Sequence, residues 1–123
     1  MRRVLIVEDS EDIRFTLSQL LTLEGYEVVE AGDGAQALDL ARNASPDLVL
    51  MDLSIPVIDG FEAARQLRQN AALREVPIIA LTGHDLSDFQ ARIAEAGFTD
   101  SLAKPVDFDA LTDTLSRYLS AES

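Results

Sequence analysis

The sequence contains no cysteine, which excludes disulfide bonds, thiolate catalysis and thiolate metal sites. No apolar run approaches the roughly 18–20 residues that a transmembrane helix needs. The first residues also do not form a signal peptide, because only four apolar residues separate the initial basic pair from the acidic pair Glu8-Asp9. These absences predict a cytoplasmic protein with no membrane-spanning segment.

Basic residues are scarce. The chain has 10 Lys and Arg against 22 Asp and Glu, for a formal net charge of −12. This charge repels phosphate backbones, so we expect no direct binding to nucleic acid. Solubility explains most of the acidic residues. A few of them, described below, require a more specific explanation.

The length and composition are those of an ordinary globular domain. The chain has 123 residues, of which 47% are hydrophobic and 26% are charged. We find no linker, low-complexity segment or internal repeat. The sequence therefore predicts that residues 1–123 form one domain.

Five apolar runs are typical of β-strands. They cover residues 4–7, 26–29, 48–51, 76–81 and 101–103. The first, third and fourth runs are almost continuously apolar, which favours strands buried on both faces of a parallel sheet.

Helical spacing of apolar residues predicts a helix after each strand. The residues that carry this spacing are Ile13, Leu17, Leu20 and Leu21; Ala37, Leu38 and Ala41; Phe61, Ala64 and Leu67; Phe89, Ile93 and Ala96; and Phe108, Leu111, Leu115 and Leu119. Gly25, Pro46 and Gly97 mark helix ends, and Asp107 is a candidate N-cap.

Strands that alternate with helices predict an α/β fold, an open parallel sheet with helices on both faces. Right-handed crossovers leave few possible topologies. The simplest for five strands and five helices is the flavodoxin-like strand order 2-1-3-4-5.

Polar residues with chemical potential follow four of the predicted strands. Glu8 and Asp9 follow the first strand, Asp52 the third, Thr82 the fourth and Lys104 the fifth. Ligands of such sheets bind beyond the carboxyl ends of the strands, and the predicted order makes strands one and three neighbours. Three carboxylates at close quarters repel one another, and a hard divalent cation such as Mg²⁺ would offset this repulsion.

Each residue also has a simpler explanation. Glu8 and Asp9 could be acids at a helix N-terminus, Asp52 and Thr82 could belong to turns, and Lys104 could be solvated. The joint placement at four strand ends favours a shared site. A metal, an ammonium group and a hydroxyl around one carboxylate suit phosphoryl transfer, with Asp52 as the nucleophile.

The sequence resembles the response-regulator receiver family from residue 4 to residue 119. The resemblance rests on the first strand with its acidic pair (VLIVED, residues 4–9), on LVLMDLSIPVIDG at 48–60 with its D-x-x-x-P-x-x-x-G pattern, on ALTG at 80–83, on AGF at 96–98 and on Lys104-Pro105. The family match implies two-component signal transduction. The protein would be no enzyme beyond catalysing its own phosphorylation and dephosphorylation.

The resemblance implies a Mg²⁺ site. Asp9 and Asp52 would bind the metal directly, together with the backbone carbonyl of Ser54. Glu8, where Asp is the commoner residue, would act mainly through a metal-bound water.

The resemblance also implies the phosphoryl chemistry. Asp52 would take the phosphoryl group from a histidine kinase or a histidine phosphotransfer protein. Thr82 would move to contact that group, and Lys104 would pair with it. The Lys104-Pro105 peptide is expected to be cis, which is accessible only before proline.

Three positions vary the family pattern. Ser101 stands where the family often has an aromatic residue that moves inward together with Thr82, so the usual switch is in question. Ser54 and His84, each two residues after Asp52 or Thr82, are expected to tune how fast the phosphoryl group is lost. The simpler explanation of His84 is an exposed loop residue.

Two other functions compete with the phosphoacceptor. Gly32-Asp33-Gly34 begins a G-x-G-x-x-A pattern typical of dinucleotide-binding turns, with Asp52 placed as a ribose-binding acid would be. That function leaves Thr82 and Lys104 without roles. The second alternative is a degenerate receiver that acts only as an interaction scaffold.

We expect no output domain after the fifth predicted helix. If this is the natural chain, a separate effector protein would read the phosphorylated state, and the protein would be a monomer or weak dimer. Otherwise the chain is a receiver from a hybrid kinase, or a phosphate relay. The expected reading surface comprises the fourth helix, fifth strand and fifth helix.

Overall fold

Strands and helices alternate along the chain. The computed structural model describes residues 2–83 and 86–119, with the side chains of 86–90 left undescribed. The elements are β1 (Arg3–Val7), α1 (Glu11–Leu23), β2 (Glu27–Ala31), α2 (Gly34–Ala44), β3 (Leu48–Asp52), α3 (Gly60–Gln69), the short 3₁₀ helix η1 (Ala71–Leu73), β4 (Ile78–Thr82), α4 (Leu86–Ala96), β5 (Asp100–Ala103) and α5 (Phe108–Leu119).

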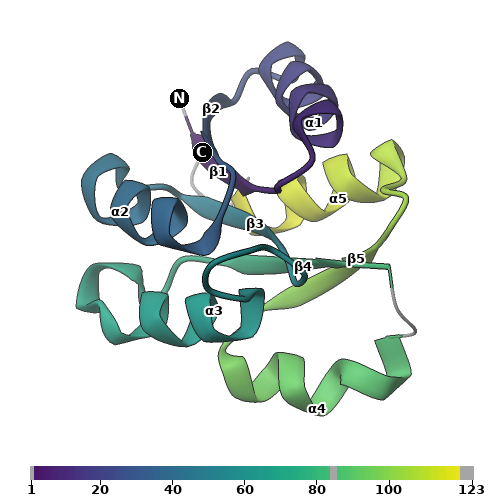
Figure 1. Ribbon diagram of the computed structural model, residues 1–123. Helices are drawn as coiled ribbons and strands as arrows, with labels where there is room; N and C mark the ends of the chain where they lie inside the picture. The colour runs from purple at the N-terminus through teal and green to yellow at the C-terminus, as the bar shows by residue number, and fades with distance from the viewer. Residues whose placement is uncertain (1, 84–85, 120–123) are drawn as a thin grey trace.

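All strand pairs in the sheet are parallel, and the order is β2-β1-β3-β4-β5 (Figure 1). This confirms the predicted topology. Val7 pairs with Met51, and Leu81 pairs with Asp52. The register therefore brings the carboxyl ends of β1, β3 and β4 to the same edge of the sheet.

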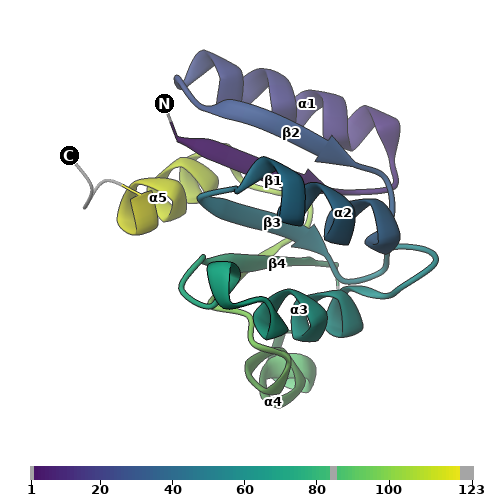
Figure 2. The same cartoon turned by 90° about the vertical axis from the view of Figure 1, so that its left-hand side faces the viewer.

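Helices cover both faces of the sheet, as predicted. On one face, α1 and α5 pack over a core cluster that includes Ile6, Leu50 and Leu81. On the other face, α2, α3 and α4 pack over a cluster that includes Val7 and Met51. Figures 1 and 2 show these two layers, with α1 and α5 on the opposite side of the sheet from α2, α3 and α4. Successive strand residues point to opposite faces of the sheet. Because helices cover both faces, β3 and β4 are buried at every position.

Polar caps and glycines set the helix ends. Ser10, Asp33 and Asp59 cap α1, α2 and α3 through their side chains. Asp107 caps α5 as predicted, because its Oδ1 accepts the Asp109 N–H at 2.9 Å. Gly25 and Gly97 follow α1 and α4 with φ of +93° and +98°, a region that favours glycine.

Some predicted details were wrong. β2 runs to Ala31 rather than to residue 29, and β4 begins at Ile78 because the preceding Pro77 has no N–H for the ladder. Ile13 and Phe108 were predicted in the core but are 39% and 45% exposed. Both lie in the first turn of a helix and line an open groove instead. The side chain of Phe89 lies outside the described residues.

None of the helices in the described part of the chain has the length and apolar content needed to cross a bilayer.

Candidate functional site

Four strand ends supply the candidate site. Glu8 and Asp9 directly follow β1, Asp52 and Thr82 are the last residues of β3 and β4, and Lys104 directly follows β5. The side chains of Glu8, Asp52 and Lys104 make direct contacts, which are given below. Thr82 is 1% exposed, and its carbonyl accepts the Lys104 N–H at 2.8 Å.

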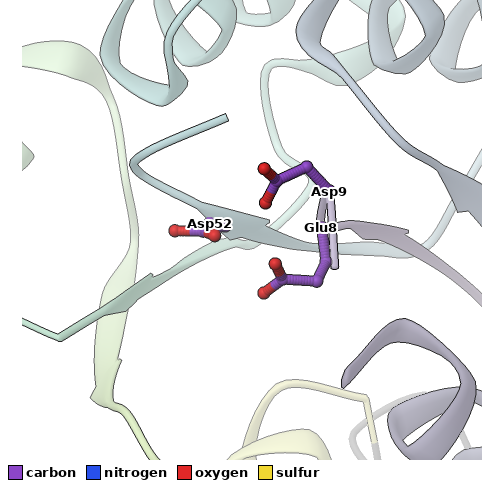
Figure 3. A group of neighbouring side chains, drawn as sticks. All are labelled: Glu8, Asp9 and Asp52. Atoms are coloured by element: carbon purple, nitrogen blue, oxygen red, sulfur yellow. The ribbon is translucent and has the colours of Figure 1, made fainter. Parts of the chain in front are cut away.

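The three acids form a compact group. Glu8, Asp9 and Asp52 each offer a carboxylate oxygen, and these oxygens all lie within 4.8 Å of one another. In Figure 3 the carboxylates of Glu8 and Asp9 both turn toward the side where Asp52 lies. Glu8 and Asp52 are 1% and 5% exposed, whereas Asp9 is open to solvent. Two members of the group are therefore buried and the third is accessible to solvent; we call the three carboxylates together the acidic pocket.

Lys104 joins the two buried acids. Its Nζ donates a hydrogen bond to Oδ2 of Asp52 at 2.8 Å and forms an ion pair with Oε1 of Glu8 at 2.9 Å. Partial burial alone lowers the pKa of Lys104. Its contacts with Asp52 and Glu8 outweigh that effect and raise the pKa above 10.5. Lys104 is therefore a fixed cation at this edge of the sheet.

Glu8 remains incompletely satisfied. Its Oε2 accepts the Ser10 N–H at 3.1 Å, but its buried Oε1 has no hydrogen bond of good geometry within the described chain. Burial raises the pKa of Glu8 above 4.5, and the nearby Asp52 raises it further, while Lys104 and the Ser10 N–H act in the opposite direction. A buried carboxylate with spare acceptor capacity suits a metal-bound water.

Asp52 is held by one donor on each oxygen. Oδ1 accepts the Ser54 N–H at 3.0 Å, and Oδ2 accepts from Lys104. The loop after β3 folds back closely, because Gly60 N–H donates to the Leu53 carbonyl at 3.1 Å. A Cβ at Gly60 would lie 2.7 Å from the Asp52 carbonyl oxygen and 2.7 Å from Leu53 Cα. The final glycine of the D-x-x-x-P-x-x-x-G pattern is therefore required by packing against Asp52.

The remaining candidates lie around this group. Ser54 is exposed, and the Lys104-Pro105 peptide is cis, as the family resemblance implied. Ser101 lies in β5, paired in register with Ala80 of β4. His84 lies outside the described residues.

Sequence reasoning missed one residue beside the acids. Arg14 of α1 donates from Nη1 to the carbonyl oxygen of Glu8 at 2.7 Å. The only available signal was an arginine one helical turn after the N-cap, Ser10. Such a position does not reveal that the side chain turns back toward β1.

The donor set fits Mg²⁺. The available ligands are hard carboxylate oxygens, which Mg²⁺ prefers, and the open side at Asp9 leaves room for the waters it retains. Lys104 alone cannot neutralise three carboxylates, so a divalent cation would also relieve their repulsion.

Comparison with known proteins identifies the family. Residues 4–116 match the response regulator receiver domain. The chain belongs to this family. The polar-differentiation response regulator DivK of Brucella ovis is 35% identical over 118 residues, which are 96% of each chain. This chain is thus a receiver domain of the two-component type, and response regulators interact with histidine kinases and downstream effectors.

Solved receiver structures agree with the fold. The chemotaxis response regulator CheY4 of Vibrio cholerae superposes with a TM-score of 0.92 at 36% identity, covering 97% of this chain and 99% of CheY4. The receiver domain of a sensor histidine kinase from Pseudomonas aeruginosa gives 0.89 at 36% identity over 97% of this receiver and 98% of that one. That structure has a magnesium ion coordinated in its active-site cleft.

The dinucleotide alternative does not fit the geometry of its glycines. A Cβ at Gly34 would collide with the backbone and side chain of Ile58, and the Gly34 N–H donates to the Pro56 carbonyl at 3.3 Å. The loop after β3 therefore occupies the space beside the first turn of α2 that a pyrophosphate would need. Gly34 serves the packing of that loop.

Proposed function

We propose that Asp52 accepts a phosphoryl group from a phosphohistidine of a histidine kinase or histidine phosphotransfer protein. The observation that supports this most is the environment of the Asp52 carboxylate. Asp52 lies at a strand end and is 5% exposed, and its carboxylate is 2.8 Å from the Lys104 ammonium and close to two further acids. In the transfer, an Asp52 oxygen forms the new P–O bond as the P–N bond to the donor histidine breaks.

The residues that would hold Mg²⁺ are Asp9 and Asp52 through their carboxylates and Ser54 through its backbone carbonyl, with Glu8 acting through water. When bound, the cation supplies positive charge that stabilises the phosphoryl oxygens during transfer.

The chain's own residues orient the nucleophile and balance charge. The Ser54 N–H and Lys104 each hold one oxygen of Asp52, so the carboxylate cannot rotate freely. After transfer, Lys104 donates to a phosphoryl oxygen in place of its contact with Asp52 Oδ2, and the Thr82 hydroxyl donates to another phosphoryl oxygen. Ser54 and His84 would tune hydrolysis of the phosphoryl group. The only reactions that the protein would catalyse are its own phosphorylation and dephosphorylation.

The phosphodonor would dock over a groove beside the site. The groove encloses about 280 Å³, and Ile13, Val106 and Phe108 contribute apolar surface to it. Lys104 lines the same groove and contacts Asp52, so a partner seated there reaches the acidic pocket. A helix that carries a phosphohistidine among apolar residues would match this surface.

Docking is tested by comparing phosphorylation by a protein donor with phosphorylation by a small-molecule donor. Phe108→Ser should slow phosphotransfer from a phosphorylated histidine domain but leave phosphorylation by acetyl phosphate unchanged, because the acidic pocket remains intact. The matched control is Leu23→Ser, since Leu23 is 82% exposed and does not line the groove. Equal slowing with both donors would contradict docking at this groove.

Phosphorylation itself is tested by intact mass after incubation with acetyl phosphate. We expect one added phosphoryl group with Mg²⁺ and none with a chelator. No added mass under either condition would instead support an interaction scaffold. A separate effector protein, a single domain, a monomer or weak dimer, and a cytoplasmic location stay predictions of the sequence.

A further inference from the structure

Arg14 links three elements around the acidic pair. Its Nη1 donates to the Glu8 carbonyl at 2.7 Å, and its Nε donates to Oε1 of Glu30 at 3.1 Å. The guanidinium thus connects α1 to the ends of β1 and β2. Its side chain is only 19% exposed, which is low for an arginine.

The bond to the Glu8 carbonyl restrains Asp9. That carbonyl belongs to the peptide plane between Glu8 and Asp9, and the next plane is held by the bond from the Ser10 N–H to Oε2 of Glu8. The two planes flanking Asp9 are therefore both held, and together they set the direction in which its Cα–Cβ bond leaves the backbone. Asp9 is exposed, so packing does not set that direction.

We propose that Arg14 is a positioning residue that aims the Asp9 carboxylate into the acidic pocket and so sets the affinity for Mg²⁺. This inference rests on the proposed function, since it requires a metal at Glu8, Asp9 and Asp52. Glu30 supports the role by holding the guanidinium in place and balancing its charge.

The positioning role and the charge of Arg14 predict opposite changes in Mg²⁺ affinity when Arg14 is replaced. Arg14 is a cation close to a cation site, so its charge alone disfavours Mg²⁺, and removing it would tighten binding. Removing a group that orients a metal ligand weakens binding, by about 10- to 100-fold for such supporting contacts. The direction of the change in affinity therefore distinguishes the two effects.

The experiment measures Mg²⁺ affinity by calorimetry and the Mg²⁺ dependence of acetyl phosphate labelling. In Arg14→Gln we expect about tenfold weaker Mg²⁺ binding. The labelling rate at saturating Mg²⁺ should stay near wild type, because Asp52, Lys104 and Thr82 are untouched. Arg14→Lys keeps the charge, but its donors all sit on one nitrogen and cannot bridge the Glu8 carbonyl and Glu30 as the guanidinium does, so its affinity should be intermediate.

Arg3 provides the matched control. It also links β1 to β2, through a 3.0 Å contact from Nε to Oε2 of Glu27, but at the opposite end of the strands. Arg3→Gln should leave Mg²⁺ affinity unchanged even where it lowers the melting temperature.

Each outcome has one meaning. Unchanged or tighter Mg²⁺ binding in Arg14→Gln, with wild-type binding intact, contradicts the positioning role and leaves the proposed function standing. Absence of Mg²⁺ binding in the wild type contradicts the proposed function instead. Should Arg14→Gln not fold, Arg14→Lys decides, because wild-type affinity in that variant would contradict the inference.

Discussion

At the scale of one residue, the buried carboxylate of Glu8 lowers the folding stability of the protein. Its carboxylate is 1% exposed, its Oε1 has an ion pair with Lys104 but no hydrogen bond of good geometry within the described chain, and burial raises its pKa above 4.5. An ionised group in that position lowers folding stability relative to its protonated form. The carboxylates of the acidic pocket therefore repel one another, and a bound cation would reduce this repulsion.

The raised pKa of Glu8 predicts a specific pH dependence without Mg²⁺. Because its folded pKa lies above 4.5, the associated stability is complete below 4.5 and is lost as pH rises through the folded pKa. As pH rises through the folded pKa of Glu8, the free energy of unfolding of the wild type should therefore fall relative to that of Glu8→Gln. Urea unfolding at a series of pH values measures this difference. The exposed Glu95 gives the control Glu95→Gln. A pH-independent difference between wild type and Glu8→Gln would contradict the prediction.

Gly60 is the residue whose replacement should disturb Asp52 most directly. An added Cβ lies 2.7 Å from the Asp52 carbonyl oxygen, so Gly60→Ala forces the strand end to shift. We expect a loss of about 1–3 kcal/mol in the free energy of unfolding. Gly83→Ala is the control, because a Cβ there meets nothing within 4 Å. Equal stabilities of the two variants in urea unfolding would show that the close approach is absent.

At the scale of elements, Arg68 joins the helices far from the acidic pocket. Its guanidinium donates to the carbonyls of Leu73, Arg74, Val76 and Gly97 and to Oγ1 of Thr99, at 2.6–3.1 Å. These bonds connect the end of α3 with η1 and with the turn between α4 and β5. One side chain thereby donates to several backbone carbonyls at a helix end and in two loops, of which the Leu73 carbonyl also accepts the Val76 N–H at 3.3 Å.

Replacing Arg68 should therefore be costly. Arg68→Ala leaves several carbonyls without donors, and we expect at least about 2 kcal/mol of lost stability in urea unfolding. Arg65→Ala is matched in chemistry, but Arg65 makes only an exposed 3.4 Å contact with Glu62, worth about 0–1 kcal/mol. Losses of similar size in both variants would contradict the role assigned to Arg68.

Most of the strands and helices, but few of the contacts between them, could be predicted from the sequence. The five strands, their order and the acids at their ends follow from apolar periodicity and from the rule that ligands bind beyond the carboxyl ends of strands. The contacts of Arg14 and Arg68 could not be predicted, because they join residues whose proximity depends on how helices pack. Ile13 was misplaced because helical spacing does not reveal that the first turn of α1 borders an open groove.

At the scale of the whole molecule, Ser101 bears on how the proposed phosphorylation of Asp52 would reach the surface of α4, β5 and α5. Ser101 pairs with Ala80, so both positions carry small side chains. Neither has the bulk to change rotamer and displace a neighbour. We therefore propose that the phosphorylated state differs subtly on this surface.

Amide shifts with Mg²⁺ and beryllofluoride, a phosphoryl mimic, test this idea. We expect clear shifts at the ends of β3 and β4 and small ones at residues 100–102. Ser101→Tyr should enlarge the shifts in β5, because an aromatic ring can change rotamer there. Large shifts confined to residues 100–102 in the wild-type protein would contradict the proposal.

The central claim is that Asp52 carries the phosphoryl group, and borohydride trapping tests it most directly. Borohydride reduces an aspartyl phosphate to homoserine, which peptide mass spectrometry then locates in the chain. After treatment with acetyl phosphate and Mg²⁺, we predict homoserine at position 52 and at no other acid, and none when Mg²⁺ is chelated. Homoserine at position 9, the corresponding reduced product hydroxynorvaline at position 8, or labelling of Asp52→Asn to the same extent, would contradict the account.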